Sequence, residues 1–596
     1  MNTIFSYLTY VLGFDSNHPL LFTQVYFWIF FLLVYAVFFY IATRHWRLTV
    51  RNAYLFAVSI FFYYKTSGIF VLLLVCSTLL GWTLGIGMDS STSPTRRKIM
   101  MAAGVTVNLL TLGFFKYAYF FTDIFNETFG TDYCIALKIL LPVGISFYTF
   151  QNISYIVDVY KQRIAHVGNV FDFGFYTSFF PQLVAGPILR ADQFVPQLYK
   201  PFHLTRRQFG LAVFWILNGL IKKIVLSDYL AVNFVDRVFD NPLLYTPFEN
   251  FSALMVYSLQ VYADFSGYTD IAIGVAMLMG FHLPTNFNSP YKAQNPTDFW
   301  RRWHISLSHW LRDYLYIPLG GNRSAGWASY SLLTIILAIA AFRLHHWWFT
   351  LTIIAVLLSL ALCYLLRPNL RHEMGTNVNN MDTMLLGGLW HGASFNFITW
   401  GGLNGLGILV YKWWHKHSWK TRLTTLTIIT AFLWILKFTT HYPLANMLSF
   451  ISLVCLIGYM VQAYNTKHIT LNTIWNTGLT FVFISFTRLF FRSGSNLDPA
   501  EANKVAWLTA RQMVNQIGSR WNIAQIPEII GQYWPIFLLF VIGMAIHWLP
   551  ARFKRRYRLW FAQMPLWGLV LAIIATIYIL RQFITAELQP FIYFQF

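Results

Sequence analysis

The chain has 596 residues, of which 57% are hydrophobic and 11% are charged. Soluble proteins carry about 25% charged residues, so this composition excludes a soluble protein and predicts an all-α polytopic membrane protein. The net charge of +21 does not indicate nucleic-acid binding. The Lys and Arg residues stand in short clusters between apolar runs, where the orientation signals of membrane proteins occur.

The apolar runs continue almost from end to end, so we expect one membrane domain over residues 1–596, with N-terminal helices in 21–140. The first run, about 21–42, is followed by Arg44, Arg47 and Arg51. Cytoplasmic loops are rich in Lys and Arg, so the N-terminus is predicted to be extracytoplasmic. The same bias predicts that a last span, about 566–584, leaves the C-terminus extracytoplasmic as well.

Two carboxylates, Asp264 and Asp270, stand beside an apolar run in "YADFSGYTDIAIG", residues 262–274. One interpretation is that they pair with an arginine or complete the polar lining of a cavity. The alternative is a structural ion pair at a helix end, because an isolated charge at membrane depth is costly. The sequence contains no HExxH, GxSxG, P-loop or CxxC pattern, so we expect no metal.

The stretch "NPTDFWRRWHISLSHWLRDYLYIPLGGNR", residues 295–323, predicts a helix. Asn295 is a good N-cap and Pro296 suits the first helical position. Apolar residues then recur at helical spacing, with His304 at the flank of the stripe, and Pro318 ends the helix. The pattern is typical of a helix lying at the membrane interface.

Three arginines of this stretch, Arg301, Arg302 and Arg312, have two compatible interpretations. Their side chains extend toward the interface from a helix that lies there. They also form a candidate site for an anionic cytoplasmic donor, because arginine is well suited to binding anionic groups.

The apolar runs between 323 and 412 do not fit two cytoplasmic loops with full spans alone. We therefore predict at least one half-helix or re-entrant segment in this region. Irregular backbone at membrane depth occurs only where it is buried in protein or lines a cavity, and broken segments are common at membrane-protein sites. The region is therefore a place to look for the functional site.

The stretch "LLGGLWHGASFNFITWGGLNG", residues 385–405, places His391 among glycines in an otherwise apolar run. An ionisable group at membrane depth indicates a functional site, although a packing role is the alternative. The imidazole pKa lies near physiological pH, so His391 is a candidate general base. Asn396 and Asn404 are candidates for orienting His391 or a substrate carbonyl.

These stretches together resemble the bacterial branch of the membrane-bound O-acyltransferase family, whose members acetylate alginate, peptidoglycan or cellulose. The likeness also includes "PVGISFYTFQNISYIVDVY" (142–160), "FFPQLVAGPILRADQFVPQL" (179–198) and the terminal "PFIYFQF" (590–596). It implies a ring of roughly 11–14 membrane helices, with re-entrant segments, around a central funnel. The histidine of the family's WHG motif is His391 here, and the histidine of the WRRWH segment is His304.

The resemblance implies transfer of an acyl group, most simply acetyl, across the bacterial inner membrane to a secreted SGNH-type transferase that modifies a polysaccharide. The implied donor is cytoplasmic acetyl-CoA, a substrate rather than a tightly bound cofactor. In related systems a C-terminal tyrosine accepts the acyl group, which maps to Tyr593 in the tail 585–596. The alternatives are D-alanyl transfer from a carrier protein, acylation of a membrane lipid or sterol, and a non-enzymatic transporter.

One part of the chain departs from the family pattern. We expect the acyltransferase core in residues 141–323 and 384–411, joined by one short connection. Residues 324–383 instead contain additional apolar segments, "LLTIILAIAA" and "WWFTLTIIAVLLSLALCYLL", followed by the polar "RPNLRHEMGTNVNNMD". We interpret this region as an insertion beside the candidate site.

Overall fold

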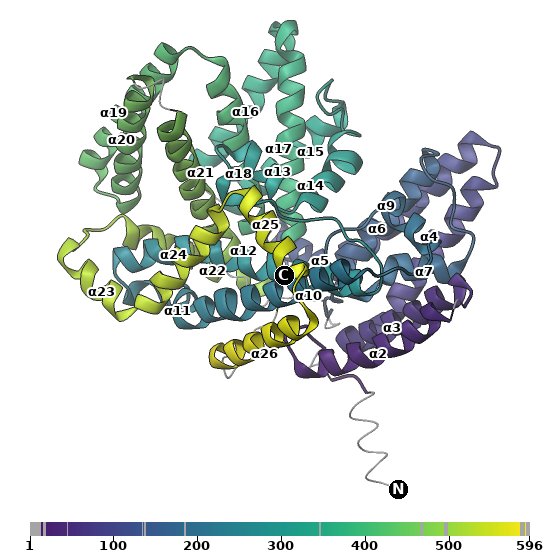
Figure 1. The fold of residues 1–596 in the computed structure, drawn as a ribbon. Coiled ribbons are helices and arrows are strands. Elements are labelled where there is room, and N and C mark those ends of the chain that lie inside the picture. Colours follow the sequence, from purple (N-terminus) through teal and green to yellow (C-terminus); the bar gives the residue numbers. More distant parts are fainter. Residues whose placement is uncertain are drawn as a thin grey trace.

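The computed structural model describes residues 13–15, 20–44, 46–133, 135, 139–183, 186–344, 347–464, 469–493, 499–584 and 591. Every regular element in these ranges is a helix, which confirms the all-α class (Figure 1). Eight described helices are long and apolar enough to cross a membrane, or ten if each of two bent pairs is one span. The polytopic membrane architecture is therefore confirmed.

The N-terminal helices form one wing of the molecule (Figure 1). The predicted first span at 21–42 corresponds to α2. The long helix α5 is capped by Ser93, whose side chain accepts a hydrogen bond from the Arg96 amide at 3.4 Å. The N-terminal elements are α2 (Val25–Thr43), α3 (Leu48–Ser67), η1 (Gly68–Phe70), α4 (Val71–Asp89) and α5 (Pro94–Phe129), and helices from residues 145–198 lie in the same wing (Figure 1).

The central helices bury the largest share of the core. Helix α12 starts with a capping box between Thr246 and Glu249, and it packs closely on α10 and η2. A Cβ at Gly267 would lie 2.8 Å from the carbonyl oxygen of Gly219, so the backbones touch there. The elements are α6 (Ile145–Tyr160), α7 (Val170–Ser178), α8 (Phe180–Leu183), α9 (Ala191–Leu198), α10 (Arg206–Leu220), η2 (Ile221–Asp228), η3 (Ala231–Val235), α11 (Asp236–Asp240), η4 (Pro242–Leu244) and α12 (Pro247–Leu278).

The stretch predicted as one helix over 295–323 is interrupted at His304. The structure divides it into α13 (Pro296–Arg302), α14 (Ile305–Leu311) and η6 (Arg312–Tyr316), after the short η5 (Pro290–Lys292). The predicted cap is confirmed, because the Asn295 side chain accepts a hydrogen bond from the Asp298 amide at 2.8 Å. His304 adopts a left-handed conformation with φ of 44°. The helix breaks because the next two amides donate to Asn286, the Ile305 amide to its carbonyl at 3.0 Å.

The region between 323 and 412 contains a sharply bent helix pair, which confirms the predicted broken segment. The pair consists of α16 and α17, and the chain turns by 113° between them. Helices α17 and α18 then form a hairpin (Figure 1), with His391 at its turn. The elements are α15 (Trp327–Leu344), α16 (Trp347–Leu366), η7 (Pro368–Leu370), α17 (Arg371–His391) and α18 (Phe395–Lys416).

The C-terminal helices complete the fold. Helix α21 packs against both α12 and α18, so it connects the centre of the molecule to the hairpin. The predicted last span at 566–584 corresponds to α26. The elements are α19 (Trp419–Thr440), α20 (Pro443–Tyr464), α21 (Ile469–Arg492), α22 (Pro499–Ile517), η8 (Ile523–Gln525), α23 (Ile526–Gln532), α24 (Trp534–Trp548), α25 (Ala551–Ala562) and α26 (Leu566–Phe583).

Candidate active site

His391 is the last residue of α17 and is only 3% exposed. Aromatic rings surround its imidazole: the ring centroids of Trp390, Trp400 and Phe491 lie 4.8, 5.0 and 5.2 Å away. These rings come from α17, α18 and α21, so the histidine lies where the hairpin meets the central helices. Such a dry aromatic environment strengthens any electrostatic interaction made inside it.

Lys116 and Tyr117 of α5 hold the end of the helix that carries His391. The Lys116 ammonium donates to the Trp390 carbonyl and, at 3.4 Å, to the His391 carbonyl. The Tyr117 hydroxyl donates to the Leu389 carbonyl at 2.9 Å. The last carbonyls of a helix lack intrahelical partners and carry partial negative charge, so a lysine there is favourable. Neither residue was predicted from the sequence, although a lone lysine within the apolar segment "LGFFKYAYFF" indicates a functional position.

His304 lies at the break between α13 and α14 and is buried. The Asn286 side-chain oxygen accepts hydrogen bonds from the Ser306 amide at 3.1 Å and hydroxyl at 2.9 Å. The His304 Nδ1 atom lies 3.2 Å from the same oxygen, so Nδ1 must be the donor. This tautomer leaves the lone pair of the imidazole on Nε2. Burial lowers the pKa of His304 to about 3, so its imidazole is neutral at pH 7.

The structure brings the two predicted histidines together on one indole. The Trp390 ring lies 4.8 Å from His391 and 5.9 Å from His304. The His304 imidazole also packs edge-to-face on the Phe265 ring, and the two ring centroids lie 4.6 Å apart. Two histidines 87 positions apart in the chain thus share one aromatic chamber. We call this chamber, defined by Trp390, Trp400, Phe265 and Phe491, the histidine chamber.

Phe591, the one described residue of 585–596, packs against the wall of the histidine chamber. Phe591 is 2% exposed, and its ring lies 5.7 Å from Phe265 and 4.8 Å from Tyr268. Phe265 is the residue that packs on His304. Tyr593, the predicted acyl acceptor, lies outside the described residues.

Asp264 and Asp270 are in the interior of α12 and form ion pairs with lysines of η2. The Lys223 ammonium lies 2.6 Å from Asp264, and the Lys222 ammonium lies 2.7 Å from Asp270. Asn218 also donates to Asp270 at 2.6 Å. The predicted arginine partner and the predicted position at a helix end are both replaced by this arrangement. The pairs connect α12 to the neighbouring helix η2.

Asn396 and Asn404 fasten α18 to α21. The Asn396 amide donates to the Ser493 carbonyl at 3.1 Å, and the Asn404 amide donates to Trp400 O at 2.8 Å and to the Thr487 hydroxyl at 3.3 Å. Their side-chain oxygens are buried and have no hydrogen-bond partner within the described part of the chain.

The three predicted donor-binding arginines do not form one group. Arg301 is exposed on α13. Arg302 pairs with Asp298 of the same helix at 3.0 Å, whereas Arg312 pairs with Asp313 at 2.6 Å. Arg312 remains 54% exposed, so it is open to solvent despite its ion pair.

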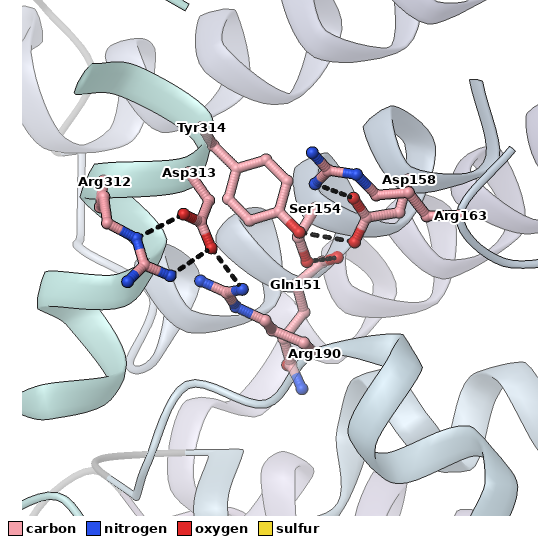
Figure 2. Close-up of polar contacts among 8 residues, drawn as sticks. All are labelled: Gln151, Ser154, Asp158, Arg163, Arg190, Arg312, Asp313 and Tyr314. Carbon is pink, nitrogen blue, oxygen red and sulfur yellow. Dashed lines mark hydrogen bonds and ion pairs between the residues drawn. The ribbon is translucent and has the colours of Figure 1, made fainter. Parts of the chain in front are cut away.

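Figure 2 shows that Arg312 belongs to a polar group contributed by three segments of the chain. Arg190, before α9, reaches the Asp313 carboxylate at 2.7 Å. Tyr314 donates to Asp158 of α6 at 2.6 Å. Burial acts to raise the pKa of Asp313, but hydrogen bonds and charge from Arg312 and Arg190 outweigh it and lower that pKa to about 2.

Comparison with known proteins finds similarity to proteins that are named as bacterial acetylases and acetyltransferases. It is 37% identical over 368 residues to a probable alginate O-acetylase of Pseudomonas aeruginosa, covering 61% of each chain. It is 32% identical over 411 residues to a peptidoglycan O-acetyltransferase of Helicobacter pylori, covering 65% of this chain and 68% of that one. Residues 161–380 match the model of the membrane-bound O-acyltransferase family.

The chain belongs to the membrane-bound O-acyltransferase family. A more distant member, a teichoic acid D-alanyltransferase of Bacillus subtilis, is 25% identical over 301 residues, covering 48% of this chain and 64% of that one. The chain spans 61% of the length of the Pseudomonas aeruginosa relative. The part that matches the membrane-bound O-acyltransferase model contains His304 and ends before His391.

Proposed function

We propose that this protein is an O-acyltransferase of the bacterial inner membrane. It takes an acyl group, most simply acetyl, from a cytoplasmic donor and delivers it across the membrane to a secreted SGNH-type transferase. That partner then acetylates an extracellular or cell-wall polysaccharide. Support comes from the relatives named alginate O-acetylase and peptidoglycan O-acetyltransferase, and from the spanning helices of the chain. Both termini are proposed to be extracytoplasmic on the basis of charge bias.

The observation that carries the proposal is the position of Phe591: its ring packs on Phe265, and Phe265 packs on His304. Two residues of extended chain span at most about 7 Å, and Tyr593 follows Phe591 by two residues. We therefore propose that the Tyr593 hydroxyl acts in the histidine chamber. A C-terminal aromatic anchor would be unnecessary if the acceptor were a lipid.

In the proposed reaction His391 removes the proton of the Tyr593 hydroxyl as its oxygen attacks the thioester carbonyl of acetyl-CoA. The new C–O bond forms, the C–S bond breaks, and the thiolate of CoA leaves and takes the proton from His391. A phenol with a pKa near 10 is almost wholly neutral at pH 7, so it needs such a base. General-base catalysis of this kind contributes roughly 10²–10⁴-fold. His304, with the lone pair on Nε2, assists by accepting a hydrogen bond.

The donor is proposed to bind at the cytoplasmic face, with its phosphates near the exposed Arg301 and Arg312. Arg302 is already paired with Asp298, so its contribution is smaller. No tightly bound cofactor takes part in the proposed reaction. The acetyl ester of Tyr593 is an activated aryl ester, which can pass its acetyl group to a serine of the secreted partner.

The second candidate is D-alanyl transfer from a carrier protein, and the similarity to a teichoic acid D-alanyltransferase favours it. The two functions differ in their donor. Purified protein is supplied either with labelled acetyl-CoA or with a D-alanyl-loaded carrier protein, and transfer of the label to protein is measured. Labelling from acetyl-CoA alone supports the first function, and labelling from the carrier alone replaces it with the second.

The direct test follows the label to one residue. Mass spectrometry of wild-type protein incubated with labelled acetyl-CoA should find the acetyl group on Tyr593. Tyr593→Phe should abolish both labelling and polymer acetylation, and His391→Ala should do the same without loss of thermal stability. Undiminished polymer acetylation by Tyr593→Phe would exclude the acyl-tyrosine, and full activity of His391→Ala would remove His391 from the site. Transport of a solute by the His391→Ala variant, with no acyl transfer by wild type, would support a transporter.

A further inference from the structure

Arg488 of α21 is a buried arginine that the sequence analysis did not single out. Arg488 is only 4% exposed. Its Nη1 donates to the Ser258 carbonyl at 3.3 Å. The guanidinium carbon lies 4.2 Å from the ring centroid of Trp303, and the rings of Tyr291 and Phe299 lie 5.6 and 5.9 Å away. Aromatic faces therefore surround this cation.

No carboxylate of the described residues forms an ion pair with Arg488, whereas its neighbours in the core are paired. Arg492, one turn further along α21, lies 2.8 Å from Asp236. Lys223 lies 2.6 Å from Asp264. A buried cation without a counter-ion is destabilising, and cation–π contacts with one carbonyl offset only part of that cost. A buried charged residue of a membrane protein that has hydrogen-bond partners but no counter-ion indicates a functional site.

The position of Arg488 relates it to both histidines. Phe491 lies three residues later, on the same face of α21, and its ring packs on His391 at 5.2 Å. Trp303, the residue closest to the guanidinium among the three rings, immediately precedes His304. The guanidinium therefore packs on Trp303, the residue before His304, and lies one helical turn from Phe491 of the histidine chamber. The negative charge that it lacks in the resting protein arises in that chamber during acyl transfer.

We propose that Arg488 stabilises the oxyanion of the tetrahedral intermediate, an inference that rests on the proposed function. When the acceptor oxygen attacks the thioester, the carbonyl π electrons move to the carbonyl oxygen, which becomes an oxyanion. The guanidinium donates hydrogen bonds to that oxyanion while His391 holds the acceptor's proton. When the C–S bond breaks, the electron pair returns to restore the carbonyl, and the leaving thiolate takes the proton from His391.

A preorganised donor of this kind acts on the transition state and not on the bound substrate. Removing one oxyanion donor typically lowers kcat about 10²–10³-fold. Arg488→Met should therefore lower kcat for acetyl transfer by about this factor and leave KM for acetyl-CoA within about two-fold. Arg488→Lys, which retains the charge, should keep more activity than Arg488→Met. A larger KM with unchanged kcat would overturn the proposal.

Chemical rescue separates catalysis from a structural role. Guanidinium ion added to Arg488→Ala should raise kcat at least ten-fold, because the small cation fills the vacated volume. Arg492→Ala is the matched control: it deletes an equivalent side chain one turn away, and guanidinium should not raise its kcat. Equal rescue of Arg488→Ala and Arg492→Ala would overturn the proposal. The proposal would also be overturned if guanidinium did not rescue Arg488→Ala and Arg488→Met kept full activity. The stability of all variants is compared by thermal unfolding in detergent. If Arg488→Ala and Arg488→Met do not fold, the kcat of Arg488→Lys provides the kinetic test.

The donor also distinguishes this proposal from a role in selecting the acyl group. Wild type and Arg488→Met are assayed with acetyl-CoA and with succinyl-CoA, whose acyl group carries a carboxylate. A similar loss of kcat with both donors is the expected result. Loss of succinyl transfer alone would overturn the oxyanion role and assign Arg488 to binding an acidic acyl group. Failure of the proposed function would look different, because wild-type protein would then transfer neither group.

Discussion

The hairpin that carries His391 is closed by two glycines, and one added methyl group there should displace the histidine. Gly388 of α17 and Gly401 of α18 face each other across the hairpin. A Cβ at position 401 would lie 2.2 Å from the Met384 carbonyl oxygen, and a Cβ at position 388 would lie 2.2 Å from the Phe397 carbonyl oxygen. Both obstacles are backbone atoms of a paired helix, so neither can rotate away.

The size of the effect follows from that distance. Ordinary contact begins at 3.4 Å, so α17 and α18 must separate by on the order of 1 Å to accept Gly401→Ala. Overpacking of this kind costs about 1–3 kcal/mol of unfolding free energy. A misplacement of about 1 Å in a catalytic group can lower the rate about 10²-fold. We therefore expect Gly401→Ala to lower both the unfolding temperature and kcat, with the larger effect on kcat.

The assay compares Gly401→Ala with Gly478→Ala in purified protein. Gly478 of α21 is also helical, but a Cβ there meets no atom within 4 Å. Alanine is the better helix former by about 1 kcal/mol, so the control should be as stable as wild type or slightly more stable. Acetyl transfer is measured with labelled acetyl-CoA and stability by thermal unfolding in detergent. Wild-type kcat in Gly401→Ala would refute the claim that the hairpin contact positions His391.

Three further outcomes are expected. Lys116→Met should lower kcat with little change in KM. It leaves the Trp390 carbonyl without its hydrogen bond, so the free energy of unfolding should fall by about 1–3 kcal/mol. Wild-type kcat in this variant would exclude a positioning role for Lys116. Phe591→Ala should reduce docking of the tail about 10- to 100-fold, because burying a phenyl ring is worth about 1.5–3 kcal/mol, and acetylation of Tyr593 followed by mass spectrometry should fall accordingly. The pKa of Asp313 is about 2 in the folded protein and about 3.9 in the unfolded chain. The ionised carboxylate therefore stabilises the folded protein by about 2 kcal/mol above pH 4, and this stabilisation is lost as the pH falls toward 2. Asp313→Asn should be less stable than wild type at pH 7, and the difference should vanish near pH 2; an unchanged difference would contradict the ion pairs.

The class of fold was within reach of the sequence, and so was the choice of His391 and His304 as candidate site residues. Apolar runs of spanning length predict membrane helices, and a histidine among glycines in such a run stands out. The break at His304 was not predictable from its own stretch, because that stretch has helical periodicity throughout. The interruption depends on Asn286, eighteen positions earlier, which takes the amide hydrogen bonds that a continuous helix would use.

The groups that complete the site come from distant parts of the chain. Lys116 meets His391 across more than 270 positions, and Arg488 meets Ser258 across 230. A single sequence shows that such cations occur in apolar runs but not which residue they contact. The sequence also does not show which arginines of residues 295–323 are already in ion pairs, as Arg302 is with Asp298 and Arg312 with Asp313.

The anchoring of Phe591 in the core has a kinetic consequence. An acceptor fixed to its own enzyme meets the donor at a constant effective concentration, so the first half of the proposed reaction does not depend on how much polymer is present. Delivery to the secreted partner requires the loaded arm to withdraw from the core. The strength of the Phe591 contact therefore sets a residence time: a tighter contact loads the arm more completely but releases it more slowly, and turnover is fastest at an intermediate strength.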